Sequence, residues 1–368
     1  MKKVVIAPDS FKGTLSSLEV CQIIEKALKN KYKDIEIFSI PIADGGEGLT
    51  ECFLYAFPKS EKIHCQAESP LGTTREVFYG VIGGDTAVIE MAQASGITIE
   101  KENDPMKAST FGTGQMIRHA LDSGIRKFLI GIGGSATTDA GIGCVGALGG
   151  KFLDKNGCSV PLCGEGLKEI EKIDLSGLDK RLKDSDITVL CDVKNPLYGE
   201  KGAAYIYAPQ KGASKSQVID LDMGLSLLGE KAKEYLGEDY SSLEGAGAAG
   251  GLGFALVAFL GAKLKRGIDT ILDITDFQNK TVGADLVITG EGKMDEQSLM
   301  GKVPFGIAST SKGKKTIAIV GLNTAKCSDI QKAGISLVIE TNPQHLPFEQ
   351  IKDKAAQDLA AASEKITL

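Results

Sequence analysis

Short apolar runs rich in valine and isoleucine recur along the chain and stop abruptly at Gly, Pro, Asp or Ser. The runs are KKVVIAPDS, IEIFSIPIADGGEG, KFLIGIGGS, ITVLCDVKNP, ADLVITGEG and KTIAIVGLN. Continuous apolar runs of this length are typical of strands that are buried on both faces of a sheet. Because helical patterns lie between the runs, the sequence predicts an α/β fold with mainly parallel sheets and right-handed crossovers.

The segments between these runs have the periodicity of amphipathic helices. In SSLEVCQIIEKALKN, the predicted apolar stripe consists of Leu18, Cys21, Ile24 and Leu28. Ser16 and Glu19 predict a capping box at the start of this helix. GTGQMIRHALDSG predicts a second helix that ends at Gly124. Two longer helices are predicted over SKSQVIDLDMGLSLLGEKAKEYLG and FEQIKDKAAQDLAAASEKI.

The length of 368 residues favours two domains, because it is long for one hydrophobic core. Candidate boundaries fall near ESPLGTTREV and DITDFQNKTVGA. We therefore expect a discontinuous α/β domain built from residues 1–70 plus 280–368, in which N-terminal strands pair with C-terminal ones. The intervening residues 71–279 are expected to form an inserted α/β domain.

Polar side chains gather where the apolar runs end. The positions concerned are Asp9, Asp44, Ser135, Asp192, Glu291 and Asp295. In open α/β sheets, ligands bind outside the carboxyl ends of the strands. The sequence therefore predicts a functional site at these ends.

The composition excludes several classes of partner. The net charge is −6, and no block of lysines and arginines has the density of a nucleic-acid patch. The N-terminal apolar run is too short for a signal peptide, and no uncharged stretch is long enough to span a bilayer. We expect a cytoplasmic protein that binds neither nucleic acid nor membrane. The sequence leaves the oligomeric state open, and a homo-oligomer is compatible with it.

A glycine-rich stretch, IGIGGSATTDAGIGCVGALGG from Ile130 to Gly150, fits the dinucleotide fingerprint at two registers. Such a site needs a strand, the loop, a helix and an acid about 20 residues on, for which Asp154 is a candidate. However, Ser135, Thr137, Thr138 and Asp139 crowd the turn, and hydroxyls and amides before a helix suit any phosphate. The loop alone leaves NAD and ATP both open. A further match, EGAGAAGGLG, follows no strand and indicates close packing.

Carboxylates, lysines and glycine loops recur together in PDSFKGTLSS, ADGGEG, CDVKNPL, APQKGAS and TGEGKMDEQS. This combination is typical of phosphoryl transfer, in which cations neutralise the transferred group and an acid orients the accepting hydroxyl. Mg²⁺ prefers one or two carboxylates plus phosphate oxygens. A hydride-transfer enzyme would need fewer acids and often uses a histidine or a lysine beside the carbonyl, and the 3 histidines lie in none of these motifs.

Taken in order, the motifs from APDSFKGTLS to GKVPFGIA resemble the glycerate kinase family over residues 7 to about 308. The resemblance implies ATP-dependent, Mg²⁺-requiring phosphorylation of D-glycerate and favours 2-phosphoglycerate as the product. It also implies two α/β domains around a cleft, the middle one flavodoxin-like and the other Rossmann-like and discontinuous. The departures are small: one glycine is lost after Asp139, and Ser298 stands where the family usually has threonine.

The site residues are chosen by their chemistry and their place in these motifs. Asp192 is predicted to be the general base, with Lys12 and Lys211 as further catalytic residues. Substrate binding is predicted for Asp9, Ser10, Asp44, Gly45 and Gly46. Binding of the nucleotide phosphates is predicted for Gly133, Gly134, Ser135, Thr137, Gly290 and Gly292. The predicted metal ligands are Glu291, Asp295 and Asp139.

Two other functions fit parts of the sequence. An NAD(P)-dependent dehydrogenase of a small hydroxy acid would use the loop at Gly131 and Asp154. A non-catalytic protein that binds a small anion would fit two domains, but this function explains poorly why so many carboxylates gather.

Overall fold

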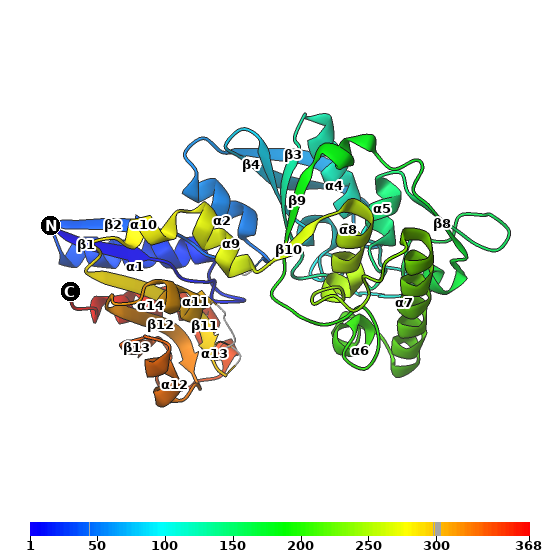
Figure 1. Cartoon of the computed structure of the whole chain (residues 1–368). Coiled ribbons are helices and arrows are strands. Elements are labelled where there is room, and N and C mark those ends of the chain that lie inside the picture. Colours follow the sequence, from blue (N-terminus) through cyan, green and yellow to red (C-terminus); the bar gives the residue numbers. More distant parts are fainter. Residues whose placement is uncertain (44, 297, 299–302) are drawn as a thin grey trace. The chain divides into compact units, whose positions relative to one another are not determined.

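The computed structural model spans residues 1–368 and describes all of them except residues 44, 297 and 299–302. The chain divides into two compact units (Figure 1). Unit 1 comprises Met1–Asp44 and Gly267–Leu368, and unit 2 comprises Gly45–Arg266. Each unit has its own sheet and its own hydrophobic core.

The sheet of unit 1 is parallel and has the order β13-β12-β11-β1-β2. Its strands are β1 (Lys2–Ile6), β2 (Ile35–Ser39), β11 (Leu286–Met294), β12 (Thr316–Asn323) and β13 (Leu337–Glu340). The N-terminal strand β1 lies between β2 and the C-terminal strand β11, with Val4 paired to Leu286. Numbered in chain order, the strands follow 2-1-3-4-5, which is the doubly wound, flavodoxin-like order.

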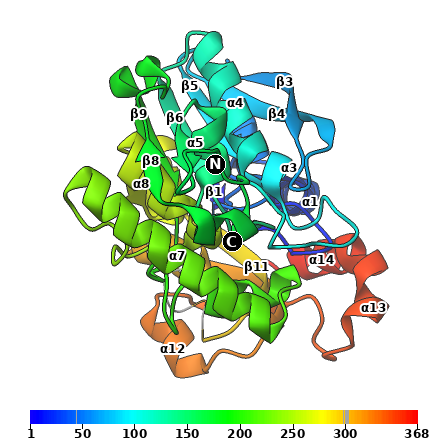
Figure 2. The same ribbon diagram turned by 90° about the vertical axis from the view of Figure 1, so that its right-hand side faces the viewer.

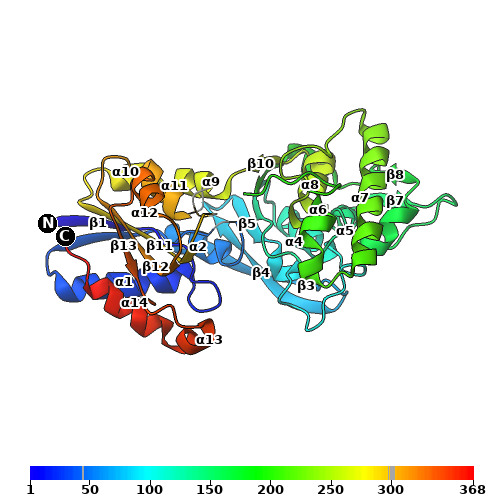
Figure 3. The ribbon, with the colours of Figure 1, turned by 90° about the horizontal axis from the view of Figure 1, so that it is seen from below.

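Helices cover both faces of this sheet (Figure 3). On one face lie α1 (Ser17–Lys31) and α14 (Ala355–Glu364), whose Ile24 and Leu359 pack against strand residues such as Ile288. The other helices of this unit are α9 (Gly267–Ile274), α10 (Phe277–Thr281), α11 (Val303–Thr310), α12 (Cys327–Lys332) and α13 (Phe348–Ile351). Alternate strand residues serve the two faces, so the continuous apolar runs are explained by burial on both sides.

The first helix confirms its predicted start. The Ser16 side chain accepts from the Glu19 amide, and the Glu19 carboxylate accepts from the Ser16 amide, which is a capping box. The buried stripe contains Cys21, Ile24 and Leu28 as predicted. Val20 completes it, whereas Leu18 is only half-buried.

The sheet of unit 2 has the order β10-β9-β6-β5-β4-β3. Its strands are β3 (Glu61–Glu68), β4 (Thr74–Ile82), β5 (Thr86–Glu90), β6 (Lys127–Gly131), β9 (Asp186–Leu190) and β10 (Lys263–Lys265). Strands β5, β6, β9 and β10 are parallel, whereas β3, β4 and β5 are joined antiparallel. The flavodoxin-like order therefore belongs to unit 1. The α/β architecture with mainly parallel sheets confirms the predicted fold class. The flavodoxin-like order was expected in the middle of the chain instead, where β3 and β4 add an antiparallel hairpin.

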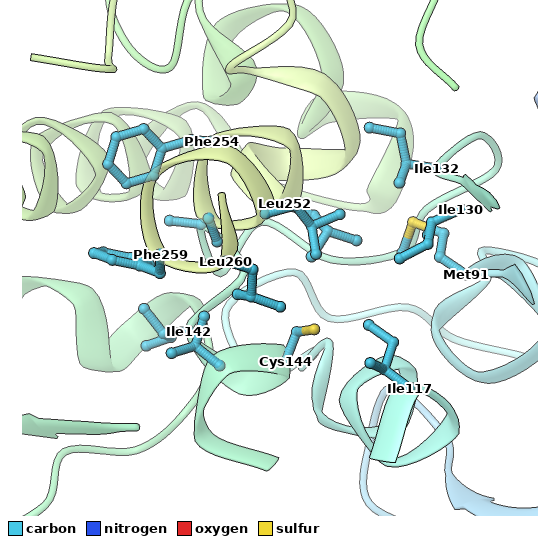
Figure 4. Close-up of a cluster of buried hydrophobic side chains, with 14 of the residues drawn as sticks. Met91, Ile117, Ile130, Ile132, Ile142, Cys144, Leu252, Phe254, Phe259 and Leu260 are labelled. Atoms are coloured by element: carbon cyan, nitrogen blue, oxygen red, sulfur yellow. The ribbon is translucent and has the colours of Figure 1, made fainter. Parts of the chain in front are cut away.

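Helices and a short hairpin complete unit 2. The helices are α2 (Leu49–Ala56), α3 (Ala92–Ser95), α4 (Phe111–Asp122), α5 (Ile142–Ala147), α6 (Ala203–Tyr207), α7 (Lys215–Leu236) and α8 (Leu252–Leu260), and the hairpin is β7 (Lys151–Leu153) with β8 (Lys172–Asp174). Helices α4 and α7 confirm two predicted helices, and α7 is the long helix labelled in Figure 2. Figure 4 shows part of the core of unit 2, where Phe259 of α8 lies near Ile142 of α5.

The unit boundaries lie outside the two sequence segments proposed as joins. ESPLGTTREV contains the turn of the β3–β4 hairpin, in which the Ser69 amide donates to the Thr73 carbonyl. Residues 45–70 therefore belong to unit 2, because β3 pairs with β4. Helix α9 ends within DITDFQNKTVGA and belongs to unit 1, where its Ile268 lies against Gly306. None of the helices in the described part of the chain has the length and apolarity needed to cross a membrane.

The second glycine-rich segment, EGAGAAGGLG, forms a close-packed support for the loop after β6. Gly250 adopts a φ of +67°, and a Cβ atom there would lie 2.0 Å from the Thr137 carbonyl oxygen. The Gly250 carbonyl accepts a hydrogen bond from the Ala140 amide at 2.9 Å. This contact between two glycine-rich segments explains the second fingerprint match by packing.

Gly250→Ala is expected to lower the free energy of unfolding by roughly 2–5 kcal/mol, because it adds a steric clash to a left-handed backbone conformation. Gly261→Ala is the matched control. Its φ is +70°, but nothing lies within 4 Å of the added Cβ. The control should lose only about 1–2 kcal/mol. Urea unfolding of both variants measures the difference, and equal losses would contradict the packing role of Gly250.

Candidate functional site

A cavity of about 340 Å³ lies at the carboxyl ends of the unit 1 strands. Its lining from the β1 and β11 ends consists of Asp9, Ser10, Phe11, Lys12, Thr14, Glu291, Gly292, Lys293 and Asp295. The remainder comes from Gly321, Thr341, Asn342, Phe348, Ile351, Ala355 and Asp358. The structure thus brings together the predicted residues of the N-terminal motif and of the TGEGKMDEQS motif, which are far apart in the sequence.

The position of the cavity follows from the strand order. In a 2-1-3-4-5 sheet, the crossovers leave in opposite directions between the first and third strands, which opens a crevice at their carboxyl ends. These strands are β1 and β11 here. The Asp9 amide donates to the Gly290 carbonyl at 2.8 Å, and the Thr289 hydroxyl donates to the Ala7 carbonyl at 2.9 Å. These bonds fix the two strand ends relative to each other.

The cavity is rich in acids but also carries lysines. The Asp9 and Glu291 side chains are buried, and the Lys293 ammonium lies 3.5 Å from the Asp295 carboxylate. Asp358 adds a carboxylate and Lys12 an exposed ammonium group. This mixture suits an anionic ligand that arrives with a cation.

The donor set fits Mg²⁺ bound together with phosphate. The described residues contain no group of three or more His, Cys, Asp or Glu side chains placed to hold a metal by themselves. Mg²⁺ in phosphoryl-transfer sites needs only one or two protein carboxylates, since phosphate and water oxygens complete its coordination. Glu291 and Asp295 provide such carboxylates on a single strand end.

The two predicted glycines of β11 differ in their surroundings. A Cβ at Gly290 would lie 2.1 Å from the Ile319 carbonyl oxygen, so packing against β12 explains this glycine. Gly292 lines the cavity, and a Cβ there would lie 3.3 Å from Phe11 Cα. Only Gly292 therefore has the position of a phosphate-binding residue.

A second group of predicted residues meets at the carboxyl ends of the unit 2 strands. The Gly133 amide donates to the Gly45 carbonyl at 3.1 Å, and a Cβ at Gly133 would lie 2.7 Å from Gly46 Cα. A Cβ at Gly45 would also lie 3.1 Å from the Leu190 carbonyl oxygen at the end of β9. Glycine at these positions therefore permits close backbone packing. Asp44, predicted to bind substrate, lies outside the described residues.

Glu90 orders the same edge, and the predicted site did not include it. This carboxylate is buried at the end of β5 and accepts from the Thr50 amide at 2.6 Å and the Gly48 amide at 3.1 Å. Burial raises the pKa of Glu90, while the bonds from Thr50 and Gly48 act in the opposite direction. The signal for it was an acid that follows the apolar run TAVI without a break.

Asp139 fills the anion-binding end of the glycine loop. Its buried carboxylate accepts from the Thr110 amide and hydroxyl at 2.8 and 2.7 Å, and from the amides of Gly141 and Gly143 at 3.0 and 3.2 Å. Burial raises the pKa of Asp139, and these hydrogen bonds oppose the shift. Because the first amides of α5 bind this carboxylate, they do not face a phosphate. The geometry favours an ordering role over the predicted metal role.

Lys211 holds the loop from the other side. Its side chain is only 2% exposed, and Nζ donates to the Ser135 hydroxyl at 2.7 Å and to the Thr137 carbonyl at 2.6 Å. Burial lowers the pKa of Lys211 to about 7, and Asp139 opposes this shift. Ser135 and Thr137 are also buried, whereas Gly134 is exposed. Lys211, predicted to meet phosphate, thus contacts the loop itself.

Asp192 lies in the exposed loop that follows β9. The neighbouring Asn195 is held in place: its Nδ2 donates to the Lys201 carbonyl at 2.7 Å, and its Oδ1 accepts from the Tyr207 hydroxyl at 2.6 Å. Asn195 therefore orders the loop that carries Asp192. Asp154, the candidate ribose ligand of a dinucleotide site, accepts from the Asn156 and Cys158 amides of its own turn.

The family, sequence and structure comparisons all find glycerate kinases as similar proteins. The model of the glycerate kinase family matches residues 4–368. A glycerate 2-kinase of Escherichia coli (strain K12) is 46% identical over 341 residues, covering 91% of this chain and 89% of that protein. A glycerate kinase of Bacillus subtilis (strain 168) is 41% identical, covering 98% and 97%. A crystal structure from Salmonella typhimurium LT2, provisionally described as glycerate kinase 2, has a TM-score of 0.86 at 40% identity, covering 99% and 96%.

The buried Lys211 predicts a pH dependence of stability. Its pKa is about 7 in the folded chain and near 10.5 when exposed, so between these values the unfolded chain binds a proton that the folded chain does not. Its contribution to the free energy of unfolding should therefore rise with pH, by up to about 1.4 kcal/mol per pH unit, and become constant below about pH 7.

Urea unfolding of the unmodified protein and of Lys211→Met between about pH 7 and pH 9 measures this contribution as a difference. The stability advantage of the unmodified protein over Lys211→Met should grow as pH rises. Lys215→Met, at an exposed position, is the control and should show no such trend. A pH-independent difference for Lys211→Met would contradict burial of an ionisable amine.

Proposed function

The chain belongs to the glycerate kinase family and is a kinase, and from this premise we propose that it transfers a phosphoryl group from ATP to D-glycerate, with Mg²⁺ as the metal and 2-phosphoglycerate as the product. The observation that carries the proposal is the cavity of unit 1, which combines carboxylates, lysines and a glycine at the β1–β11 crevice. The name of the Escherichia coli relative, glycerate 2-kinase, supports the 2-position.

In this proposal, the polar part of the cavity binds the phosphates. Glu291 and Asp295 would hold Mg²⁺, which, when bound, neutralises charge on the phosphate oxygens. Gly292 permits close approach of a phosphate to the backbone. The Lys293 ammonium lies beside Asp295 and supplies positive charge at the same strand end.

The acceptor is proposed to be bound through the β1 end and activated by a carboxylate. Ser10 and Lys12, which line the cavity, offer a hydroxyl and an ammonium group to the glycerate carboxylate. Asp9, which also lines the cavity, is proposed to accept a hydrogen bond from a glycerate hydroxyl. Asp192 is the proposed general base, because its strand-end loop is exposed and is ordered by the bonds of Asn195.

The two other functions have less support. A dinucleotide would need the first amides of α5 and an acid for its ribose, but Asp139 binds those amides and Asp154 closes its own turn. An anion-binding protein without catalysis would have little use for the carboxylates of Asp9, Glu291 and Asp295 in one cavity.

Phosphorus NMR tests the reaction directly. The protein is incubated with ATP, Mg²⁺ and D-glycerate, and the phosphorylated product is identified by its phosphorus–proton couplings. ADP and 2-phosphoglycerate should appear together. Formation of 3-phosphoglycerate would overturn the regiochemistry alone, and the absence of any phosphoglycerate would overturn the proposed reaction.

Asp192→Asn is expected to lower kcat by on the order of 10²-fold or more, because an amide cannot take the proton of the glycerate hydroxyl. The melting temperature should change little, since the side chain is exposed. Asp184→Asn, at another exposed aspartate of unit 2, is the control and should keep normal turnover. If Asp192→Asn also turns over normally, Asp192 is not the base.

A further inference from the structure

Part of the unit 1 cavity is lined by the C-terminal segment, which carries none of the residues proposed above. Phe348, Ile351, Ala355 and Asp358 belong to its lining. Successive spacings of three, four and three residues place these positions on one face of a helical segment that runs from α13 through a short 3₁₀ turn into α14. Leu359, on another face, packs into the core. The segment therefore presents one face to the core and another to the cavity.

The Phe348 ring is held in a defined position although it is 47% exposed. A Cβ at Gly13 would lie 3.0 Å from the ring carbon Cζ, so the ring rests on the loop between β1 and α1. This loop also carries Ser10 and Lys12. The aromatic lining and the polar lining of the cavity are thus physically connected.

Asn342 orders the chain segment that precedes Phe348. This buried side chain donates to the Leu346 carbonyl at 3.0 Å and accepts from the Leu346 amide at 3.0 Å. The bonds close the loop that leads from β13 into α13. Because both groups of the amide are used in this way, Asn342 orders the loop that leads to Phe348, which lowers the conformational cost that a ligand must offset.

The residues of the lining restrict which classes of ligand fit the cavity. Glycerate is a three-carbon acid with little apolar surface, whereas a cavity of about 340 Å³ is in the range of sites for larger molecules. A fitting ligand needs a charged end for the carboxylates and lysines, and a flat apolar end for Phe348, Ile351 and Ala355. Asp358 at the end of this face can accept a hydrogen bond from a hydroxyl or an amino group.

We propose that the Phe348–Asp358 face binds the nucleoside of the phosphoryl donor, with the base stacked on the Phe348 ring. The inference rests on the proposed function in one respect, namely that the donor phosphates occupy the polar part of the same cavity. Stacking on an aromatic side chain suits a nucleobase because every base has a flat π face.

Assays in the presence of Mg²⁺ test the inference, with Mg·ADP and Mg·tripolyphosphate as binding probes and glycerate as the substrate whose KM is measured. Phe348→Ala should weaken ADP binding by about 5-fold to 100-fold, the range expected when one base loses its stacking partner. Tripolyphosphate has the phosphates without the nucleoside, so its affinity should not change, and neither should the KM for glycerate. Phe348→Tyr keeps the ring and should restore ADP binding.

A fluorescence measurement gives an independent readout. The chain contains no tryptophan, so Phe348→Trp introduces a single indole reporter. ADP should quench its fluorescence saturably, and tripolyphosphate should not. Val282→Trp, at a position of unit 1 that is 65% exposed and outside the cavity lining, is the control and should not respond to ADP.

The outcomes separate the inference from the proposed function. If the unmodified protein phosphorylates glycerate but Phe348→Ala binds ADP normally, the nucleoside lies elsewhere and the inference is overturned while the function stands. If the unmodified protein fails to phosphorylate glycerate but ADP binding still depends on the Phe348 ring, the reaction is overturned and the nucleoside site is supported. Failure of the unmodified protein to bind ADP overturns the inference.

Discussion

The pairing of β1 with β11 is the constraint on which the rest of the structure depends. It joins the two ends of the chain in one sheet, through contacts such as Val4 with Leu286 and the bond from the Asp9 amide to the Gly290 carbonyl. Because β1 is inserted between β2 and β11, the crossovers diverge there and leave a crevice. The pairing also requires unit 2 to be an insertion in the sequence of unit 1. The candidate site therefore comes from residues nearly the whole chain apart.

In unit 2, two buried charged side chains order the glycine-rich loop that follows β6. Asp139 and Lys211 are both removed from water, which is costly unless each is hydrogen-bonded or paired. Asp139 accepts bonds from Thr110, Gly141 and Gly143, and Lys211 donates to Ser135 and Thr137 on the same loop. The loop that resembles a dinucleotide fingerprint is thus filled by groups of the protein itself. Its glycines permit close backbone packing, as at Gly133, where a Cβ would lie 2.7 Å from Gly46 Cα.

The strands and the helix cap that depend on local sequence pattern were predicted correctly. The six apolar runs became β1, β2, β6, β9, β11 and β12, and the capping box of α1 formed as expected. The hairpin β3–β4 was not predicted, because β3 alternates between apolar and polar residues and the apolar run VFYGVI of β4 begins at the end of the segment interpreted as a domain boundary. This shifted the domain boundaries. The roles of Asp139, Lys211 and Glu90 depend on which way each side chain points after folding, which spacing does not encode. Phe348 lies in a segment that was predicted to be helical. The sequence pattern did not indicate that a second face of this segment lines the cavity.

The charged side chains that line the cavity restrict the form in which a phosphate ligand would bind. Among the described residues of its lining, the four acids Asp9, Glu291, Asp295 and Asp358 outnumber the two lysines, Lys12 and Lys293. A free polyphosphate would meet net repulsion, since like charges in a partly buried site interact through a low effective dielectric. The same carboxylates become favourable once a divalent cation accompanies the phosphates. In the proposed site, the lining would therefore favour a metal–nucleotide complex over the free nucleotide, and the apolar face at Phe348 would add binding energy that is independent of charge.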